Sequence, residues 1–267
     1  MTLTVGSLFS GIGGIDLGLE RAGMNVLWHS EIDPYACRVL KKHWPHVPNI
    51  GNITEVDWSN IPYVDVIAGG YPCQPFSLAG KRAGENDPRH LWPYFRDAIS
   101  HLRPRYALLE NVRGHLTLGG ISVIGDLAAI GYDCEWRVIS AASVGANHKR
   151  DRLIIVAYTD NQGQVCDGAE CPRGHSSRNG GANVAHTASR GRKEVFGQAL
   201  RIVERSNDER LISATRSLPD WWQTEPDVGR VADGIPRRVD RLRGLGNAVV
   251  PQVAEVVGRL IVSHAND

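Results

Sequence analysis

The sequence alternates short apolar runs with stretches of helical periodicity over its first 158 residues, and this alternation constrains the fold more than any other feature. Helical patterns begin near Gly13, Pro34, His90 and Gly120. This spacing predicts βαβ units, and therefore an α/β fold with a doubly wound, mostly parallel sheet and helices on both faces. Ligands bind such sheets at the carboxyl ends of the strands. The predicted strands are Leu3–Phe9, Met24–His29, Val64–Ala68, Tyr106–Leu109, Asp133–Ile139 and Leu153–Tyr158.

The composition changes after this alternating region. Between residues 159 and 193 the chain has no Leu, Ile, Met, Phe, Trp or Tyr, so this segment has little apolar surface to offset the entropy of ordering. Apolar periodicity returns in Asn247–His264, which predicts a terminal helix, capped at Gly246-Asn247, that packs back on the sheet. We therefore expect one domain of residues 1–158 and 244–267, interrupted by a smaller, loop-rich region at 159–243.

Composition argues against several classes of protein. The chain has no run of 18 apolar residues, which argues against a membrane span, and its first residues lack the pattern of a secretory signal. Five cysteines spread over 267 residues argue against a disulfide framework and for a reducing cytoplasm. Because the formal net charge is +1, any surface for nucleic acid must be a local basic patch.

A glycine-rich turn follows the first predicted strand. Gly11, Gly13 and Gly14 would let backbone N–H groups approach a ligand at the start of a helix. Glu31 follows the second predicted strand, at a spacing typical of a carboxylate that binds ribose hydroxyls. Together these features indicate a nucleoside-containing cofactor, although such a turn alone is often only a tight connection. A dinucleotide oxidoreductase is an alternative, which the lack of a Gly-x-Gly-x-x-Gly pattern disfavours.

A cysteine with a proline nearby on each side follows the third predicted strand. The prolines stiffen the backbone around Cys73 at a strand end, where substrates bind. A thiol in this position is a candidate nucleophile rather than a small core residue. The polar segment 78–90 carries Lys81 and Arg82, and we expect it to be a mobile loop that can close over a phosphate backbone.

Two further motifs put charged side chains at strand ends. Glu110 follows the fourth apolar run, where burial would raise the pKa of its carboxyl group and allow it to donate a proton. Strand alternation puts Arg150 and Arg152 on one face, where two guanidinium groups suit a phosphate or a base edge. Taken alone, either motif could equally be a set of solvated surface charges.

Four sequence strings occur together along the chain: Phe-Ser-Gly-Ile-Gly-Gly, Gly-Gly-Tyr-Pro-Cys-Gln-Pro-Phe-Ser, Glu-Asn-Val and Gly-Leu-Gly-Asn-Ala-Val-Val-Pro. In these strings, their order and their spacing, the chain resembles the DNA (cytosine-5)-methyltransferases over most of its length. The resemblance implies the fold of S-adenosylmethionine-dependent methyltransferases, with 159–243 as a target-recognition region. It also implies methyl transfer from S-adenosylmethionine to C5 of a cytosine flipped out of a specific double-stranded DNA sequence, through a covalent Cys73–C6 bond, as in restriction-modification systems.

The resemblance also assigns residues to the cofactor. Asn52 stands where the family usually has an Asp, and its amide can still hydrogen-bond a purine edge. Phe9, Ile32 and Ile53 are implied to lie near adenine, and Glu31 to bind the ribose. The full set implied for S-adenosylmethionine is Phe9, Gly11, Gly13, Gly14, Glu31, Ile32, Asn52, Ile53, Pro72, Leu91, Asn247 and Val249.

The catalytic residues implied by the resemblance act on the cytosine ring. Cys73 would add to C6, Glu110 would protonate N3, and Asn111 would orient this region, while Arg150 and Arg152 would hold the base and the neighbouring backbone. The residues expected to contact DNA are Gln74, Ser77, Lys81, Arg82, His148, Arg237 and Arg238, of which His148 stands where the family typically has Gln. No metal is expected, because the spacing of Cys166, Cys171, His175 and His186 is loose for a zinc site.

Three alternatives remain open at this point: the same methylation on tRNA, a catalytically silent DNA-binding homologue, and the oxidoreductase. The polar insert and the basic segment near residues 237–243 favour DNA over tRNA. We expect a monomer that acts on double-stranded DNA, without a membrane, in the cytoplasm of a bacterial cell or a phage-infected host.

Overall fold

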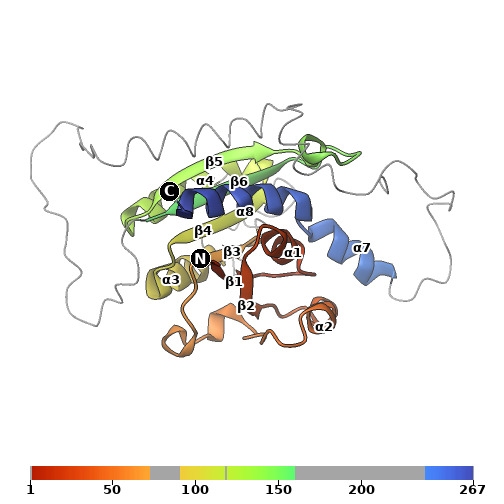
Figure 1. The fold of residues 1–267 in the computed structure, drawn as a ribbon, viewed down its shortest axis with the longest axis horizontal. Helices are drawn as coiled ribbons and strands as arrows, with labels where there is room; N and C mark the ends of the chain where they lie inside the picture. Colours follow the sequence, from red (N-terminus) through yellow and green to blue (C-terminus); the bar gives the residue numbers. More distant parts are fainter. Residues whose placement is uncertain (1, 73–90, 118, 160–237, 267) are drawn as a thin grey trace, which may run out of the picture.

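In a computed structural model of the chain, the described residues are 2–72, 91–117, 119–159 and 238–266. They form a six-stranded sheet with helices packed against it (Figure 1). The strands are β1 (Thr4–Leu8), β2 (Asn25–Ser30), β3 (Val66–Gly69), β4 (Tyr106–Val112), β5 (Asp133–Ile139) and β6 (Arg152–Tyr158). Each coincides with a strand predicted from the sequence, apart from its ends.

Helices alternate with the strands as the sequence predicts. The longer ones are α1 (Gly14–Arg21), α2 (Pro34–His43), α3 (Trp92–Leu102), α4 (Gly120–Ala129), α7 (Arg238–Asn247) and α8 (Pro251–Asn266). Short 3-10 helices are η1 (Ile53–Glu55), η2 (Trp58–Asn60), η5 (Arg113–Leu116) and η6 (Ala141–Val144). The start of α2 shows how local sequence sets where a helix begins. The Asp33 carboxylate accepts from the N–H groups of Tyr35 and Ala36, and Pro34 sits in the first turn.

The strand order is β2-β1-β3-β4-β6-β5. β1 to β4 are mutually parallel, whereas β6 runs antiparallel to both β4 and β5. The sheet is therefore mostly parallel and has one reversed strand, which confirms the predicted fold class. The reversal brings the first residue of β6, Arg152, opposite Val112 at the carboxyl end of β4.

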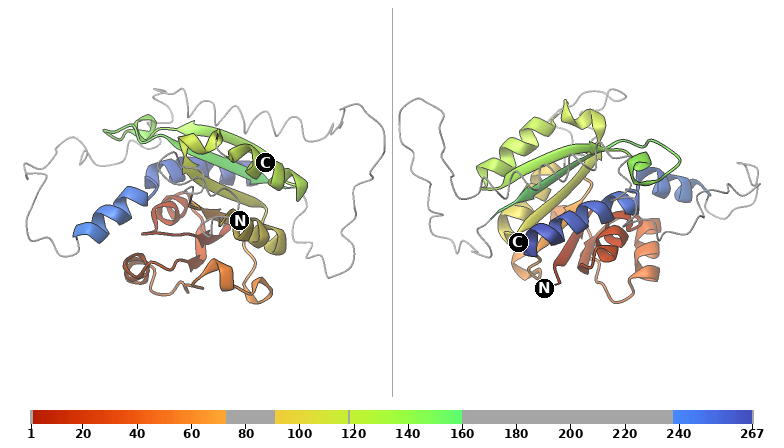
Figure 2. Two further views of the ribbon diagram at one scale, coloured as in Figure 1. Left: turned by 180° about the vertical axis from the view of Figure 1, so that it is seen from behind. Right: turned by 45° about the horizontal axis from the view of Figure 1, so that its top comes forward.

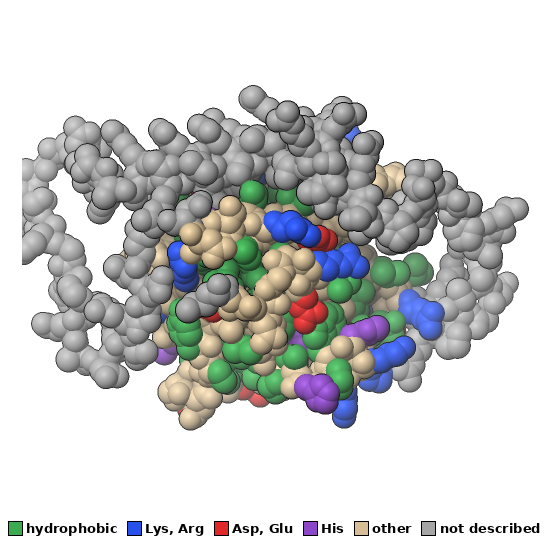
Figure 3. All heavy atoms as spheres, in the orientation of Figure 1, with side chains coloured by type: hydrophobic (Ala, Val, Ile, Leu, Met, Phe, Trp, Pro, Cys, Tyr) green, Lys and Arg blue, Asp and Glu red, His purple; other side chains and the backbone are tan. Residues whose placement is uncertain are grey.

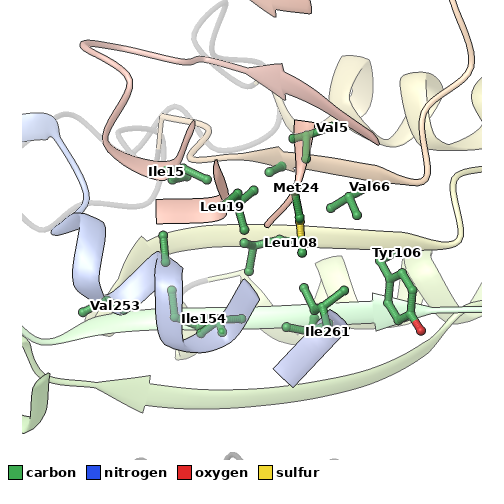
Figure 4. Close-up of a cluster of buried hydrophobic side chains, with 14 of the residues drawn as sticks. Val5, Ile15, Leu19, Met24, Val66, Tyr106, Leu108, Ile154, Val253 and Ile261 are labelled. Atoms are coloured by element: carbon green, nitrogen blue, oxygen red, sulfur yellow. The ribbon is translucent and has the colours of Figure 1, made fainter. Parts of the chain in front are cut away.

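Two apolar layers cover the two faces of the sheet. In β4, Tyr106 and Leu108 belong to one layer, while Ala107 and Leu109 belong to the other, as strand alternation requires. The first layer packs α1 and α8 on the sheet (Figure 4). The second layer includes the buried residues of α3 and α4. Helices on both faces fix the carboxyl ends of β1 to β4 as one rigid edge.

The terminal helix lies beside the first helix of the chain (Figures 1 and 2). Gly18 of α1 permits this, because a Cβ atom there would come within 2.3 Å of the Pro251 carbonyl oxygen. The predicted single helix Asn247–His264 is wrong in its start: Asn247 is the last residue of α7, and α8 begins at Pro251. Proline has no backbone N–H to donate to the hydrogen-bond ladder, so the helix breaks here and a new one starts with Pro251 at its first position.

The segment Val239–Asn266 meets the length and hydropathy criteria for a membrane span, as one candidate within the described part of the chain. Half of its most apolar stretch of 18 residues is buried inside the protein. The buried residues of α8, including Val253, Val257 and Ile261, belong to the layer shared with α1. Core helices pass the same criteria, and packing accounts for the apolar character of this one.

Candidate functional site

The glycine-rich turn joins β1 to α1 at the carboxyl edge of the sheet. Phe9, Gly11 and Gly13 all have left-handed backbones, with φ values of 52°, 56° and 84°. Glycine adopts this region without steric cost, whereas a phenylalanine there is unusual and indicates a constrained turn. A Cβ atom at Gly13 would also lie 2.4 Å from the Trp44 ring. The turn thus depends on its glycines for both conformation and space.

Glu31 is held against this turn by backbone donors. Its Oε2 atom accepts from the N–H of Gly11 at 2.7 Å, and Oε1 accepts from the N–H groups of Ile32 and Asp33 at 2.8 and 2.7 Å. Asn49 fixes the Glu31 backbone, accepting from its N–H at 3.0 Å and donating to its carbonyl at 2.9 Å. The carboxylate is therefore preorganised beside the glycine turn.

The chain returns to the glycine turn at the junction of α7 and α8. A Cβ atom at Gly14 would lie 2.4 Å from the Val249 carbonyl oxygen, so residue 14 must lack a side chain for the two segments to meet. Val249 is buried, whereas Asn247 is exposed. Two of the residues predicted for the cofactor, Gly14 and Val249, are thus brought together from opposite ends of the chain.

The structure also describes the surroundings of the other residues predicted for the cofactor. Ile32 is 66% exposed beside Glu31, although it is apolar. Phe9 meets Phe95 edge to face at a centroid distance of 6.2 Å. Ile53 is buried in the core, and Asn52 caps η1 by accepting from the Thr54 N–H at 3.2 Å. Pro72 is exposed and Leu91 is partly buried at the start of α3.

These features fit a nucleoside-containing cofactor. A carboxylate has about four lone-pair positions, and the backbone donors to Glu31 occupy three of them. One position therefore remains for a ribose hydroxyl. The exposed Ile32 surface next to Glu31 offers an apolar contact for a flat ring. The glycine turn and the start of α1 provide the close backbone approach that such a ligand needs.

A buried carboxyl group lies at the end of β4. Glu110 is 8% exposed, and its Oε1 atom is 2.7 Å from Nε of Arg152. Burial raises the pKa of Glu110, and the charges of Arg152 and Arg150 offset part of that rise. Its Oε2 atom would be only 2.6 Å from a Cβ atom at Gly70, so the carboxyl group lies against the backbone that leads to Cys73.

Asn111 holds the same backbone from the neighbouring position. Its side-chain nitrogen donates to the Tyr71 carbonyl at 3.2 Å, and its oxygen accepts from the Val112 N–H at 2.8 Å. The Tyr71 hydroxyl pairs with Nε2 of His115 at 2.7 Å. Neither Tyr71 nor His115 is among the residues predicted for the site, and the sequence signal for Tyr71 is its position directly before the Pro-Cys pair.

Arg150 does not contact the Glu110 carboxylate. Its Nη2 atom donates to the carbonyl oxygens of Gly246 and Ala248, each at 2.6 Å, and lies 3.5 Å from that of Leu245. Its backbone φ is 38°. Burial and the charge of Arg152 lower the pKa of Arg150, while Glu110 acts in the opposite direction. The two arginines predicted to act together therefore have different partners.

Several predicted residues fall outside the described part of the chain, namely Cys73, Gln74, Ser77, Lys81, Arg82 and Arg237, with the cysteines and histidines weighed for zinc. Arg238 begins α7, and His148 is exposed. Basic and acidic side chains of the described residues are interspersed on the face seen in Figure 3, in keeping with the near-zero net charge. Among residues 2–72, 91–117, 119–159 and 238–266, no group of three or more His, Cys, Asp or Glu could hold a metal ion.

The comparisons with known proteins agree with this geometry. A family model described as C-5 cytosine-specific DNA methylase matches residues 3–187. The type II methyltransferase M.Eco47II of Escherichia coli is 44% identical over 171 residues, which cover 59% of this chain. This chain spans only 40% of the length of that relative. The type II methyltransferase M.NgoMIV of Neisseria gonorrhoeae is 29% identical over 315 residues, covering 98% of both chains.

A solved structure shares the fold at low sequence identity. A DNMT2 mutant of Spodoptera frugiperda matches with a TM-score of 0.62 and 18% identity, covering 98% of this chain and 100% of that one. At this identity the likeness concerns the fold alone. It confirms the predicted α/β fold of the S-adenosylmethionine-dependent methyltransferase type.

Proposed function

This chain belongs to the C-5 cytosine-specific DNA methylase family, and from that premise we propose that it transfers a methyl group from S-adenosylmethionine to C5 of a cytosine in double-stranded DNA. The observation that carries the proposal is the position of Glu110. Its buried carboxyl group, with a raised pKa, lies against Gly70, three residues before Cys73 in the sequence. Glu110 lies in β4, and Cys73 follows four residues after the end of the neighbouring strand β3 in the sequence; an acid and a thiol are the two groups that this chemistry requires.

Cys73 is proposed as the nucleophile, because C5 of cytosine is too weak a nucleophile to take a methyl group unaided. Its thiolate forms a bond to C6, which makes C5 electron-rich. The bound cofactor supplies the electrophilic methyl group that C5 attacks. A base such as water then takes the C5 proton, the Cys73 sulfur leaves C6 as a thiolate so that the C5–C6 double bond re-forms, and N3 gives its proton back, which releases the methylated base. Asn111 supports this role by holding the Tyr71 carbonyl, two residues before the thiol.

Glu110 is proposed as the acid that protonates N3 as the thiolate adds. Protonation drains the negative charge that the addition introduces into the ring. The raised pKa keeps a larger fraction of the carboxyl group protonated near neutral pH than an exposed glutamate would have. Arg152 is proposed to hold the carboxyl group in place and to face the base, since it already pairs with Oε1.

The cofactor is proposed to bind at the glycine turn, beside its contact with Val249. Glu31 would accept from a ribose hydroxyl, with Phe9 and Ile32 against adenine, because Glu31 is anchored and Ile32 is exposed beside it. Asn52 retains one N–H and one lone pair after its bonds to Glu55 and Thr54, so it can still meet a purine edge. The other residues assigned by the resemblance, Gly11, Gly13, Ile53, Pro72, Leu91 and Asn247, remain proposals.

DNA is proposed as the substrate, with the target base flipped out of the duplex, because C5 and C6 are stacked within it. Residues 159–243 are proposed as the target-recognition region. The contacts proposed on sequence grounds are Gln74, Ser77, Lys81, Arg82, His148, Arg237 and Arg238. One flipped base requires one active site, which supports a monomer.

The experiment that tests the proposed function compares substrates directly. The protein is incubated with labelled S-adenosylmethionine and, separately, with unmethylated genomic DNA and with bulk tRNA. We expect label in the DNA alone, and bisulfite sequencing should then place 5-methylcytosine within one recurring sequence. Label in tRNA alone would replace DNA by RNA as the substrate, and no label in either would support the catalytically silent alternative.

A further inference from the structure

The Arg150 guanidinium group lies at the end of α7, where carbonyl groups lack partners within the helix. Nη2 donates to the Gly246 and Ala248 carbonyls at 2.6 Å, across more than 90 residues of sequence. The last carbonyls of a helix carry partial negative charge, and a planar cation with five N–H donors suits them. From this contact we infer that Arg150 is a positioning residue that holds the α7–α8 junction closed over the cofactor site. This inference rests on the proposed function.

A second observation supports a fixed role for this residue. The Arg150 backbone has a φ of 38°, in the region that non-glycine residues rarely adopt. Strained residues of this kind persist only where the surrounding contacts determine their conformation. The next ordered element is β6, which begins two residues later and pairs with β4 and β5. The Arg150 backbone is thus anchored next to the sheet, while its guanidinium group reaches the end of α7.

The junction that Arg150 holds is the one that meets the glycine turn. Ala248, whose carbonyl accepts from Arg150, directly precedes Val249, whose backbone leaves no room for a Cβ atom at Gly14. Gly244 also lies close to the turn, since a Cβ atom there would be 3.1 Å from the Ile12 side chain. Releasing the junction from Arg150 therefore frees a wall of the proposed cofactor site.

This assignment separates the two arginines of one strand end. Arg152 pairs with Glu110 and therefore serves the acid, whereas Arg150 serves the cofactor wall. If Arg150 contacts the flipped base or a phosphate, as the resemblance implies, its substitution should weaken only steps that involve DNA. If Arg150 positions the junction, its substitution should weaken cofactor binding even in the absence of DNA.

The test measures cofactor affinity without DNA. Isothermal titration of S-adenosylhomocysteine into Arg150→Ala should give a dissociation constant at least about tenfold weaker than wild type, as expected if the closed junction becomes a minor state. Arg150→Lys keeps the positive charge but lacks the planar set of guanidinium donors, so its dissociation constant should lie between those of wild type and Arg150→Ala. Arg105→Ala is the matched control, because it removes an arginine–carbonyl bond at the other end of α8, to Ala265 at 3.2 Å, and should leave the affinity unchanged.

Amide hydrogen exchange gives a readout that does not depend on the ligand. The amides of residues 246–250 should exchange faster in Arg150→Ala and in Arg150→Lys than in wild type, while those of α3 remain unchanged. Wild-type exchange at the junction in both variants, or wild-type affinity for S-adenosylhomocysteine with a loss seen only on DNA, would overturn the inference. If wild type itself binds no S-adenosylhomocysteine, the proposed function fails, and the exchange experiment still decides whether Arg150 holds the junction.

Discussion

The Nε atom of Arg152 lies 2.7 Å from the Oε1 atom of Glu110, at the point where antiparallel β6 begins beside the carboxyl end of β4. A buried carboxyl group next to a cation can either ionise or remain neutral, depending on whether burial or charge dominates. In this site burial dominates, because the pKa of Glu110 is raised despite the two arginines. The relationship therefore supports an acid whose strength is tuned by its neighbour.

The first prediction concerns pH. Because N3 protonation needs the protonated acid, kcat/KM should fall as pH rises through the raised pKa of Glu110. Glu110→Gln keeps the shape of the side chain but cannot donate this proton. Its activity should drop about 10²–10⁴-fold, and the fall of kcat/KM with rising pH, the alkaline limb of the pH–rate profile, should vanish. The measurement is a pH–rate profile of both proteins, and an identical limb in the Gln variant would assign it to another group.

The free energy of unfolding should also depend on the protonation of Glu110, and it should fall as pH rises. The unfolded carboxyl ionises near the ordinary pKa of 4.5, below the folded value, so the stability that Glu110 contributes is complete below 4.5. It is lost as pH rises through the raised folded pKa. The free energy of unfolding of Glu110→Gln should lack this decline, which denaturant titrations at several pH values would detect.

Arg152→Ala should move the alkaline limb of the pH–rate profile to higher pH. The Arg152 charge lowers the pKa of Glu110, so its removal raises that pKa further and keeps the acid protonated to higher pH. The variant should also lose up to about 3 kcal/mol of stability at neutral pH, since a buried carboxyl loses its partner. A limb that stays in place, measured by the same profile, would mean that Arg152 does not govern this proton.

Gly14→Ala should weaken cofactor binding and destabilise the fold by about 1–3 kcal/mol, because the new methyl group would meet the Val249 carbonyl. Gly125→Ala is the matched control: it lies in α4 with nothing within 4 Å of the added Cβ atom. It should stabilise the protein by about 0.5–1 kcal/mol and leave binding intact. Thermal melts and titrations of both variants check this, and equal behaviour would contradict the close approach.

Glu31→Gln should weaken S-adenosylmethionine binding by about tenfold or more, since a charged acceptor is lost and an amide nitrogen would face a backbone donor. The N–H groups of Gly11, Ile32 and Asp33 all point at this carboxylate. Asp97→Asn on α3 removes a half-exposed carboxylate and serves as the control for net charge. Unchanged affinity in the Gln variant would argue that Glu31 only supports the turn.

The sequence predicted the parts of the fold that depend on local pattern. The strands, the helices of the first 158 residues and the position of Glu31 just after β2 follow from periodicity and short motifs, whereas Glu110 lies within β4 and not after it. The burial of Glu110 was left open by the sequence, because an acid that ends an apolar run can equally be exposed to solvent, and the structure shows it to be 8% exposed. The need for glycine at position 14, by contrast, becomes clear only from the structure, because the Val249 carbonyl that excludes a side chain there is distant in the sequence.

The remainder depends on contacts between distant segments. Strand direction is not encoded in an apolar run, so the reversal of β6, which brings Arg152 to Glu110, could not be read from the pattern. The carbonyl partners of Arg150 lie 95 or more positions away in the sequence. The break between α7 and α8 was misassigned because Asn247 is both a common helix cap and an acceptable final helical residue.

The central claim is that the Cys73 sulfur bonds to cytosine, and trapping on fluorinated DNA tests it most directly. Genomic DNA amplified with 5-fluorodeoxycytidine triphosphate contains targets whose C5 fluorine cannot leave as a proton does. With S-adenosylmethionine present, the wild-type protein should form a complex with this DNA that survives denaturing gels, and Cys73→Ser, shown by titration to bind the cofactor, should form none and have no turnover. A denaturation-resistant complex or normal turnover with Cys73→Ser would contradict the account.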